Sequence, residues 1–366
     1  MPTRKTEIDV AKGFALFLVV FGHVLESHGL WFNWIFTFHM PAFFFLSGMT
    51  FRPEKYLNYR HFLKDKWKKR ILPYFMITAI GFLICMLRPD YRLPVLQDGL
   101  RYQLTWIFYY AQPKNLYIGQ CWFLIGLFMA ELFSYTWFRL FGNRSLTAKG
   151  YSLVALAFIA THIRAVDAFL PMDRLPWKID TGFGAAVFVI AGYYATQTKI
   201  FEKLRPASLV LIPLGTLLSY YFGPKLFGYV NICDCVYSAA PYYFTAAFLG
   251  ILPLMLTAQL LKNSRFWQYC GRYSLPLFAS QTFAIYLVVE AIAKVTGKLY
   301  TPMHDVGDKL SLAISLAAFA LMLLFVLPWH LYKSHKSDKN DKNGKNHISH
   351  INHKSRRRNA SPTALK

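Results

Sequence analysis

The ionisable residues of the first apolar segment are the first candidates for chemistry. Asp9, Lys12, His23 and Glu26 all fall at or inside the predicted membrane span 8–27. On a helix with about 100° per residue, Lys12 and His23 lie about 20° from a common direction. Asp9 and Glu26 fall close to the same face, so this span has one polar side. Ionisable groups inside a membrane are costly, which makes each of them a candidate functional residue.

A purely structural interpretation covers only part of this set. Asp9 and Lys12 lie near the predicted end of the helix, where charged side chains can reach the lipid headgroups. His23 is predicted to lie well inside the apolar part, where an imidazole needs another explanation. We therefore take His23, Glu26 and Asp9 as candidate catalytic residues.

A second histidine, His39, is predicted to face the first. It lies in the next span, 31–51, after a connection so short that the two helices must be antiparallel neighbours. The rise per residue places His23 and His39 at depths that differ by roughly 6 Å. Pro41 removes a backbone hydrogen bond and can open the helix there.

Two facing histidines near a carboxylate are suited to general acid–base catalysis near neutral pH. Haem or metal binding is the alternative chemistry. A metal site would need a third protein ligand at a similar depth, and no further His or Cys obviously supplies one. We therefore expect no metal, and we interpret Cys233 and Cys235 as ordinary small residues near a loop.

The connection 52–70 reads RPEKYLNYRHFLKDKWKKR and is strongly basic. Lys66, Lys69 and Arg70 recur at i, i+3 and i+4, so they are predicted to share one helix face. Two interpretations stay open. The cations can act as a positive-inside topology signal, or they can bind a polyanionic cofactor through its phosphates.

The composition places these residues in a membrane. Hydrophobic residues make up 55% of the chain and charged residues only 16%, against about a quarter charged in soluble domains. Apolar runs of about 20 residues match the thickness of a bilayer. We predict an all-α polytopic membrane protein, with a re-entrant or interfacial helix over 100–112. About ten spans are expected, over 8–27, 31–51, 71–88, 119–141, 151–170, 180–198, 207–223, 239–261, 274–296 and 309–332.

The net charge of +23 fits a membrane surface better than nucleic acid. Lys and Arg concentrate in alternate connections and in the tail, which predicts that both termini are cytoplasmic. Residues 1–332 would form the transmembrane domain. Residues 333–366 are rich in Lys, Asn and Ser, and are predicted to be a disordered basic cytoplasmic tail.

Six blocks follow one another between about residue 7 and residue 285. They are EIDVAKGFALFLVVFGH (7–23), FHMPAFFFLSGMTF (38–51), KKRILPYF (68–75), CWFLIGLF (121–128), KIDTGFGAAVFVIAGYY (178–194) and GRYSLPLFASQ (271–281). In content and order they resemble acyltransferase family three, and within it the branch of fucose 4-O-acetylases and other sugar O-acetyltransferases.

The resemblance implies transfer of an acetyl or other small acyl group from cytoplasmic acyl-CoA to a glycan hydroxyl. It also implies that Lys12 and His23, a cation followed by a histidine eleven residues later, belong to the site. Many members have Arg at the position of Lys12, and a lysine cannot bind a phosphate in a bidentate manner. Relatives often carry His at the position of Gln281, which receives no catalytic role.

The resulting hypothesis docks the phosphates of the acyl-CoA on Lys66, Lys69 and Arg70. His23 then acts as general base, oriented by Glu26 or His39, or as the nucleophile. Acetyl-CoA is expected as donor and no cofactor as permanently bound. Membrane lipids, a glycan or lipid-linked sugar acceptor and a polysaccharide-assembly complex are the expected partners, in the inner membrane of a bacterium.

Two other classes of function remain as alternatives. A transporter or flippase for a glycan or lipid-linked sugar would also have many spans and buried polar groups. No internal repeat, which many transporters contain, is visible in the sequence. A structural partner in a polysaccharide complex would need neither the histidine pair nor the basic connection.

Overall fold

The computed structural model describes residues 5–114, 118–170, 172–223, 228–237, 242–298, 300–304 and 306–328. Within these ranges the regular structure is helical, and the only strand-like pairing there is an isolated bridge between Asn231 and Val236. The predicted all-α class is confirmed. The predicted tail, 333–366, lies outside the described residues.

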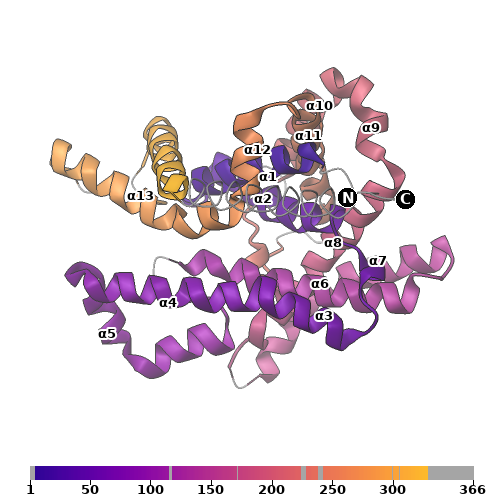
Figure 1. Ribbon diagram of the computed structural model, residues 1–366, viewed down its shortest axis with the longest axis horizontal. Helices are drawn as coiled ribbons and strands as arrows, with labels where there is room; N and C mark the ends of the chain where they lie inside the picture. The colour runs from indigo at the N-terminus through magenta and orange to yellow at the C-terminus, as the bar shows by residue number, and fades with distance from the viewer. Residues whose placement is uncertain are drawn as a thin grey trace, which may run out of the picture.

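The helices are α1 (Thr6–Gly22), α2 (Leu30–Met49), α3 (Tyr59–Lys66), α4 (Leu72–Leu87), α5 (Pro89–Leu104), α6 (Trp122–Phe141), α7 (Leu146–His162), α8 (Ile179–Thr198), α9 (Ile200–Leu204), α10 (Ser208–Tyr220), α11 (Tyr242–Leu260), α12 (Arg265–Arg272) and α13 (Ser274–Thr296), with a further helix over Asp308–Pro328. In Figure 1, α1 and α2 lie in the middle of the molecule. Helices α11 and α12 lie above them in this view, α13 extends to the left, and α4, α5 and α6 lie below.

Seven helical segments of the described chain are long and apolar enough to cross a membrane. Their number and character make the chain a polytopic membrane protein. The segments are Tyr59–Leu87, Gly119–Phe141, Leu146–Phe169, Ile200–Gly223, Tyr242–Leu260, Ser274–Thr296 and Asp308–Pro328.

The three other predicted spans are also helices, but they differ in character. Helix α1 has only 17 residues, while α2 and α8 have 20 each, and none of the three is among the seven long apolar segments. All three are largely enclosed by neighbouring helices, as α2 packs on α8 and α1 packs on α12. A helix surrounded by protein can carry polar residues that a lipid-facing helix cannot. The outer helix α7, in contrast, has almost no buried residues.

The basic connection 52–70 is more ordered than the sequence suggests. From Tyr59 the chain is helical, first as α3 and then through a π-helical turn, Trp67–Ile71, into α4. Figure 1 shows this segment as one continuous rod. The start of α3 is fixed by Asn58, whose side chain accepts a hydrogen bond from the backbone N–H of His61.

The predicted short helix over 100–112 is part of a longer helical segment. Helix α5 runs to Leu104 and continues as a π-helical turn over Thr105–Tyr109, with a break at Gly99. Gly99 has φ 78°, a conformation that favours glycine. The position of this segment in the membrane remains a prediction.

Glycines allow the inner helices to approach each other closely. A Cβ atom at Gly48 of α2 would overlap the carbonyl oxygen of Val189 on α8, and one at Gly192 of α8 would overlap that of Phe45 on α2. Gly271 of α12 meets the backbone of Asp9 on α1 in the same way. Small residues at helix interfaces are typical of membrane proteins. These contacts hold the segments that carry the candidate residues.

Candidate active site

Three cavities adjoin one another between the inner helices. The first, which we call the mouth, has a volume of about 680 Å³ and is lined by Asp9, Lys12 and Thr50, among others. The second, the neck, measures about 140 Å³ and shares Lys12 and Thr50 with the mouth. The third, the chamber, measures about 330 Å³ and shares Phe278 with the neck. Because neighbouring cavities share lining residues, they lie in series, with Lys12 near one end and the histidines at the other.

The chamber contains both predicted histidines. His23 and His39 both line it, and the ring of Phe36 lies beside each of them, with centroids 6.1 Å and 4.7 Å away. Nδ1 of His39 lies 2.7 Å from the carbonyl oxygen of Ile35. Since a carbonyl only accepts hydrogen bonds, Nδ1 carries the hydrogen, and Nε2 of a neutral His39 keeps its lone pair. The structure thus brings together the two imidazoles that the short connection places on neighbouring helices.

Glu26 and Asp9 do not join this pair. Helix α1 ends at Gly22 with His23 as its C-cap, so the helical spacing from His23 to Glu26 does not apply. Glu26 is exposed in the following turn. Asp9 lies at the other end of α1, lines the mouth, and is 3.7 Å from the Arg272 guanidinium. The predicted orienting role of Glu26 therefore has no support in this geometry.

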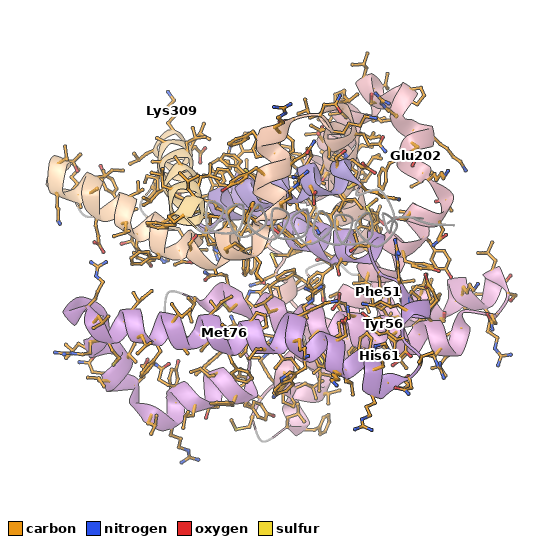
Figure 2. All side chains as sticks on the ribbon, in the orientation of Figure 1. Phe51, Tyr56, His61, Met76, Glu202 and Lys309 are labelled. Carbon is orange, nitrogen blue, oxygen red and sulfur yellow. The ribbon has the colours of Figure 1, made fainter. Side chains whose placement is uncertain are left out.

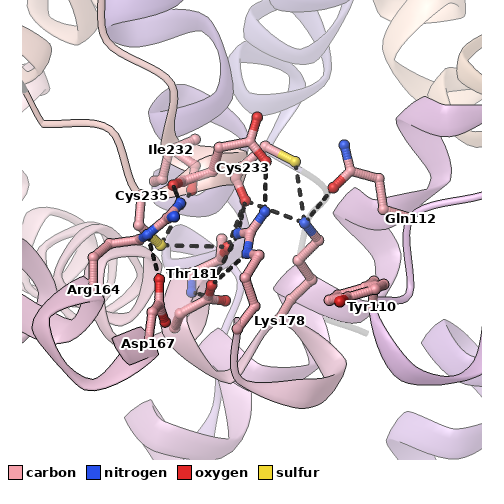
Figure 3. Close-up of polar contacts among 12 residues, drawn as sticks. Tyr110, Gln112, Arg164, Asp167, Lys178, Thr181, Ile232, Cys233 and Cys235 are labelled. Carbon is pink, nitrogen blue, oxygen red and sulfur yellow. Dashed lines mark hydrogen bonds and ion pairs between the residues drawn. The ribbon is translucent and has the colours of Figure 1, made fainter. Parts of the chain in front are cut away.

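Gln112, Cys233 and Asp234, which line the chamber, belong to a polar network that the sequence did not reveal. Figure 3 shows the contacts of this network. Arg174 donates to Asp234 at 2.7 Å, to Asp180 at 2.9 Å and to the carbonyl of Cys233 at 3.0 Å. The Lys178 ammonium donates to Gln112 at 2.6 Å and also contacts Cys233. Together these cations hold the turn that contains the Cys-x-Cys pair against the chamber.

The pKa values of Cys233 and Asp234, both in this turn, are shifted in opposite directions. Burial raises the pKa of the Cys233 thiol to about 12, so this thiol stays protonated at neutral pH. Burial would also raise the pKa of the Asp234 carboxyl, but Lys178 and Arg174 hold this pKa below its ordinary value. Asp234, which lines the chamber, is therefore a carboxylate already neutralised by Arg174.

A protein-family model described as an acyltransferase domain matches residues 5–333, which is most of the chain. The chain belongs to the acyltransferase 3 family. It is therefore a membrane-embedded enzyme that transfers acyl groups other than amino-acyl groups, and this membership favours the enzyme over the transporter alternative. No curated protein and no solved structure matches the chain.

In this acyltransferase, the predicted donor-binding cations fall in different places. Lys66 and Arg70 both bind Glu131 of α6: Lys66 Nζ lies 3.0 Å from Oε1, and the Arg70 guanidinium contacts both carboxylate oxygens at 3.0 and 3.1 Å. Ser47 donates its hydroxyl to the same carboxylate at 3.0 Å. Glu131 is buried and was not singled out from the sequence.

Lys66 is enclosed further by aromatic rings. Its ammonium lies 5.2 Å from the Phe51 ring centroid, 5.7 Å from that of Tyr56 and 5.6 Å from that of Phe62. Figure 2 labels Phe51 and Tyr56 beside the continuous helix that contains Lys66. Lys66 is only 5% exposed. A phosphate cannot reach this lysine in the observed conformation.

The three predicted cations, Lys66, Lys69 and Arg70, do not present one face to a ligand. Lys69 is half exposed and pairs with Asp65 at 2.8 Å. Arg70 is the member of the set that lines the neck, together with Lys12. Two cations that the sequence analysis did not select, Lys5 and Arg52, line the mouth. The cations that line the cavities are therefore Lys5, Lys12 and Arg52 at the mouth and Lys12 and Arg70 at the neck.

Proposed function

We propose that this acyltransferase moves an acetyl or other small acyl group from cytoplasmic acyl-CoA to a hydroxyl of a glycan or lipid-linked sugar. The observation that carries the proposal is the series of three cavities, cationic at the mouth and histidine-bearing in the chamber. Phosphates of the donor are attracted to cations, and the reacting hydroxyl needs a base.

The donor would bind with its phosphates at the mouth, near Lys5, Lys12 and Arg52. Asp9 and Glu54 line the same cavity, so the balance of charge there is only modestly positive. The neck is narrow, which suits an extended chain such as the pantetheine arm and excludes the nucleotide. Arg70, held in place by Glu131, borders this passage. The thioester would reach the chamber at its Phe278 side.

His23 would act as the base for the acceptor hydroxyl. The hydroxyl proton moves to the imidazole while the oxygen attacks the acyl carbonyl carbon. The carbon–sulfur bond then breaks, and the departing sulfur of CoA takes up the proton. His39, fixed by its bond to Ile35, would accept a hydrogen bond and position the reacting groups. In the alternative route, His23 attacks first and carries the acyl group.

The setting of the reaction belongs to the same proposal. Both termini would face the cytoplasm of a bacterium, and the chain would lie in the inner cell membrane. The acceptor would then meet the chamber from the opposite side of the bilayer. Fucose 4-O-acetylases and related sugar O-acetyltransferases are the branch that the sequence blocks resemble. Membrane lipids and a polysaccharide-assembly complex are the further partners that this setting implies.

Replacement of His23 by Ala tests the proposal. Membranes containing the variant should lose at least about a hundredfold in the rate of transfer of labelled acetyl from acetyl-CoA to glycan, since general bases contribute about 10²–10⁴-fold. His162→Ala on the exposed α7 is the matched control and should retain full activity. Normal labelling by the His23 variant would contradict the catalytic role. Movement of glycan across the membrane without labelling would support a transporter.

A further inference from the structure

One residue that lines the chamber, Gln120, has a polar atom without a hydrogen-bond partner among the described residues. Gln120 is 7% exposed and lines the chamber. Its side-chain oxygen accepts a hydrogen bond from Thr282 at 3.0 Å. Its side-chain nitrogen has no hydrogen-bond partner in the part of the chain that the structure describes. A buried donor without a partner costs free energy, which a bound ligand that accepts the hydrogen bond would recover.

The other chamber groups narrow the chemistry of that ligand. Asp234 provides a carboxylate, whereas the amide of Asn231 is already engaged by Tyr229, Asp234 and Cys233. Trp122 and Tyr229 provide aromatic surface. Amides and carboxylates bind hydroxyl groups, while aromatic rings pack against the apolar faces of a ring. The volume of about 330 Å³ is near the lower end of the usual range for small-molecule sites, about 300–1,000 Å³.

The charge of the chamber differs from that of the mouth. Among the described residues that line the chamber there is no Lys and no Arg, and Asp234 is the one carboxylate. The nearby cations Arg174 and Lys178 are engaged by Asp234, Asp180 and Gln112. An acidic or phosphorylated ligand would therefore place its charge beside a carboxylate and away from free cations, which is costly in a buried site.

We propose that the chamber binds one uncharged sugar ring and that the Gln120 side-chain nitrogen donates a hydrogen bond to one of its oxygens. This inference rests on the proposed function. It adds that the acceptor sugar is uncharged and that Gln120 positions it. The reacting hydroxyl faces His23 and His39, while Gln120 and Asp234 hold the other side of the ring.

The test measures transfer of labelled acetyl from acetyl-CoA by the full chain in proteoliposomes. The probes are methyl glycosides of neutral hexoses and 6-deoxyhexoses, with methyl glucuronide and a hexose 6-phosphate as charged counterparts. Long-chain alkyl glycosides of the same sugars form a separate arm, which distinguishes a lipid-linked acceptor from a soluble one. We expect label in neutral acceptors, and a higher melting temperature of the protein only with neutral sugars.

Two variants of Gln120 test its role. Gln120→Glu keeps the size of the side chain but removes the donor, and Gln120→Leu removes both polar atoms. Both should raise the KM for the acceptor about tenfold, the usual effect of one hydrogen bond, and leave the KM for acetyl-CoA unchanged. Gln281→Leu is the matched control, because Gln281 is also buried without hydrogen-bond partners among the described residues but lines none of the three cavities.

The outcomes separate this inference from the proposed function. If His23→Ala still transfers label, the proposed function fails. If His23→Ala is inactive but charged sugars serve as well as neutral ones, the inference fails alone. The inference also fails if none of the neutral sugars is labelled, or if none of them raises the melting temperature of the protein. It fails as well if the Gln120 variants and the Gln281 variant have equal KM values for the acceptor.

Discussion

His23 and His39 share the chamber but are held in different ways. His39 lies inside α2, and its Nδ1 hydrogen is committed to the carbonyl of Ile35. His23 is the C-cap of α1, at the point where the helix gives way to a turn. An imidazole at a helix end is less constrained by its own helix than one within it. This difference supports His23 as the group that moves the proton and His39 as the group that positions.

At the scale of single residues, Glu131 is the one whose replacement should lower the stability of the protein most. It binds Lys66, Arg70 and Ser47 in a buried cluster, so Glu131→Ala would leave two cations without their carboxylate. Removal of one partner of a buried ion pair costs about 3–5 kcal/mol. We therefore expect a clear fall in the melting temperature of the detergent-solubilised protein.

The exposed Glu202 is the control for Glu131. It lies on α9 and is labelled in Figure 2. Glu202→Ala should change stability by no more than about 0.5 kcal/mol, as is usual for surface substitutions. If Glu131→Ala melts at the same temperature as Glu202→Ala, the cluster does not hold the neck together.

At the scale of elements, the contact between α2 and α8 positions the chamber. Helix α2 brings His39 to the site, and α8 begins beside Lys178 and Asp180, which hold the opposite wall. The two helices can approach closely because glycines occupy the contact on both sides. A change of their distance would therefore move the two walls of the chamber relative to each other.

Gly48→Ala should separate these helices. Its Cβ would overlap the backbone of Val189, which cannot move aside as a side chain can. Overpacking of a well-packed interface costs about 1–3 kcal/mol, and we also expect reduced acyl transfer. Gly150→Ala on α7 is the control, because no atom lies within 4 Å of the added Cβ. Thermal melting and a transfer assay check both variants, and unchanged values for Gly48→Ala would contradict the close contact.

At the scale of the whole molecule, the three cavities adjoin one another inside the protein. Lys12 and Thr50 join the mouth to the neck, and Phe278 joins the neck to the chamber. The largely enclosed helices α1, α2 and α8 form much of this interior. Helix α7 has almost no buried residues and presents the apolar surface of a lipid-facing helix. In the proposed reaction, the acyl donor and the acceptor would meet in this interior.

Obstruction of the passage tests this arrangement. Thr50→Trp places a large side chain where mouth and neck meet and should lower kcat/KM for acyl transfer at least about tenfold. Thr50→Ser preserves the hydroxyl and the space, and should behave like the unmodified protein. The measurement is transfer of labelled acetyl in proteoliposomes, with the melting temperature recorded to confirm folding. A Trp variant with full activity would show that the donor takes another route.

The sequence alone was sufficient for the helical class, for the membrane setting and for the encounter of His23 with His39. These follow from local properties: apolar length, helical spacing and a connection too short to allow another arrangement. It also predicted that α1, α2 and α8 are spans like the others. Only the packing shows that these three helices are largely enclosed by their neighbours.

The tertiary structure decided which charged groups meet. Arg70 and Glu131 are 61 residues apart, and Arg174 and Asp234 are 60 apart, so no local spacing predicts either pair. The end of α1 at Gly22 removed Glu26 from the helix face on which periodicity had placed it. Periodicity applies only within one helix, whereas the chamber is formed where several helices and the turn around Asn231 converge.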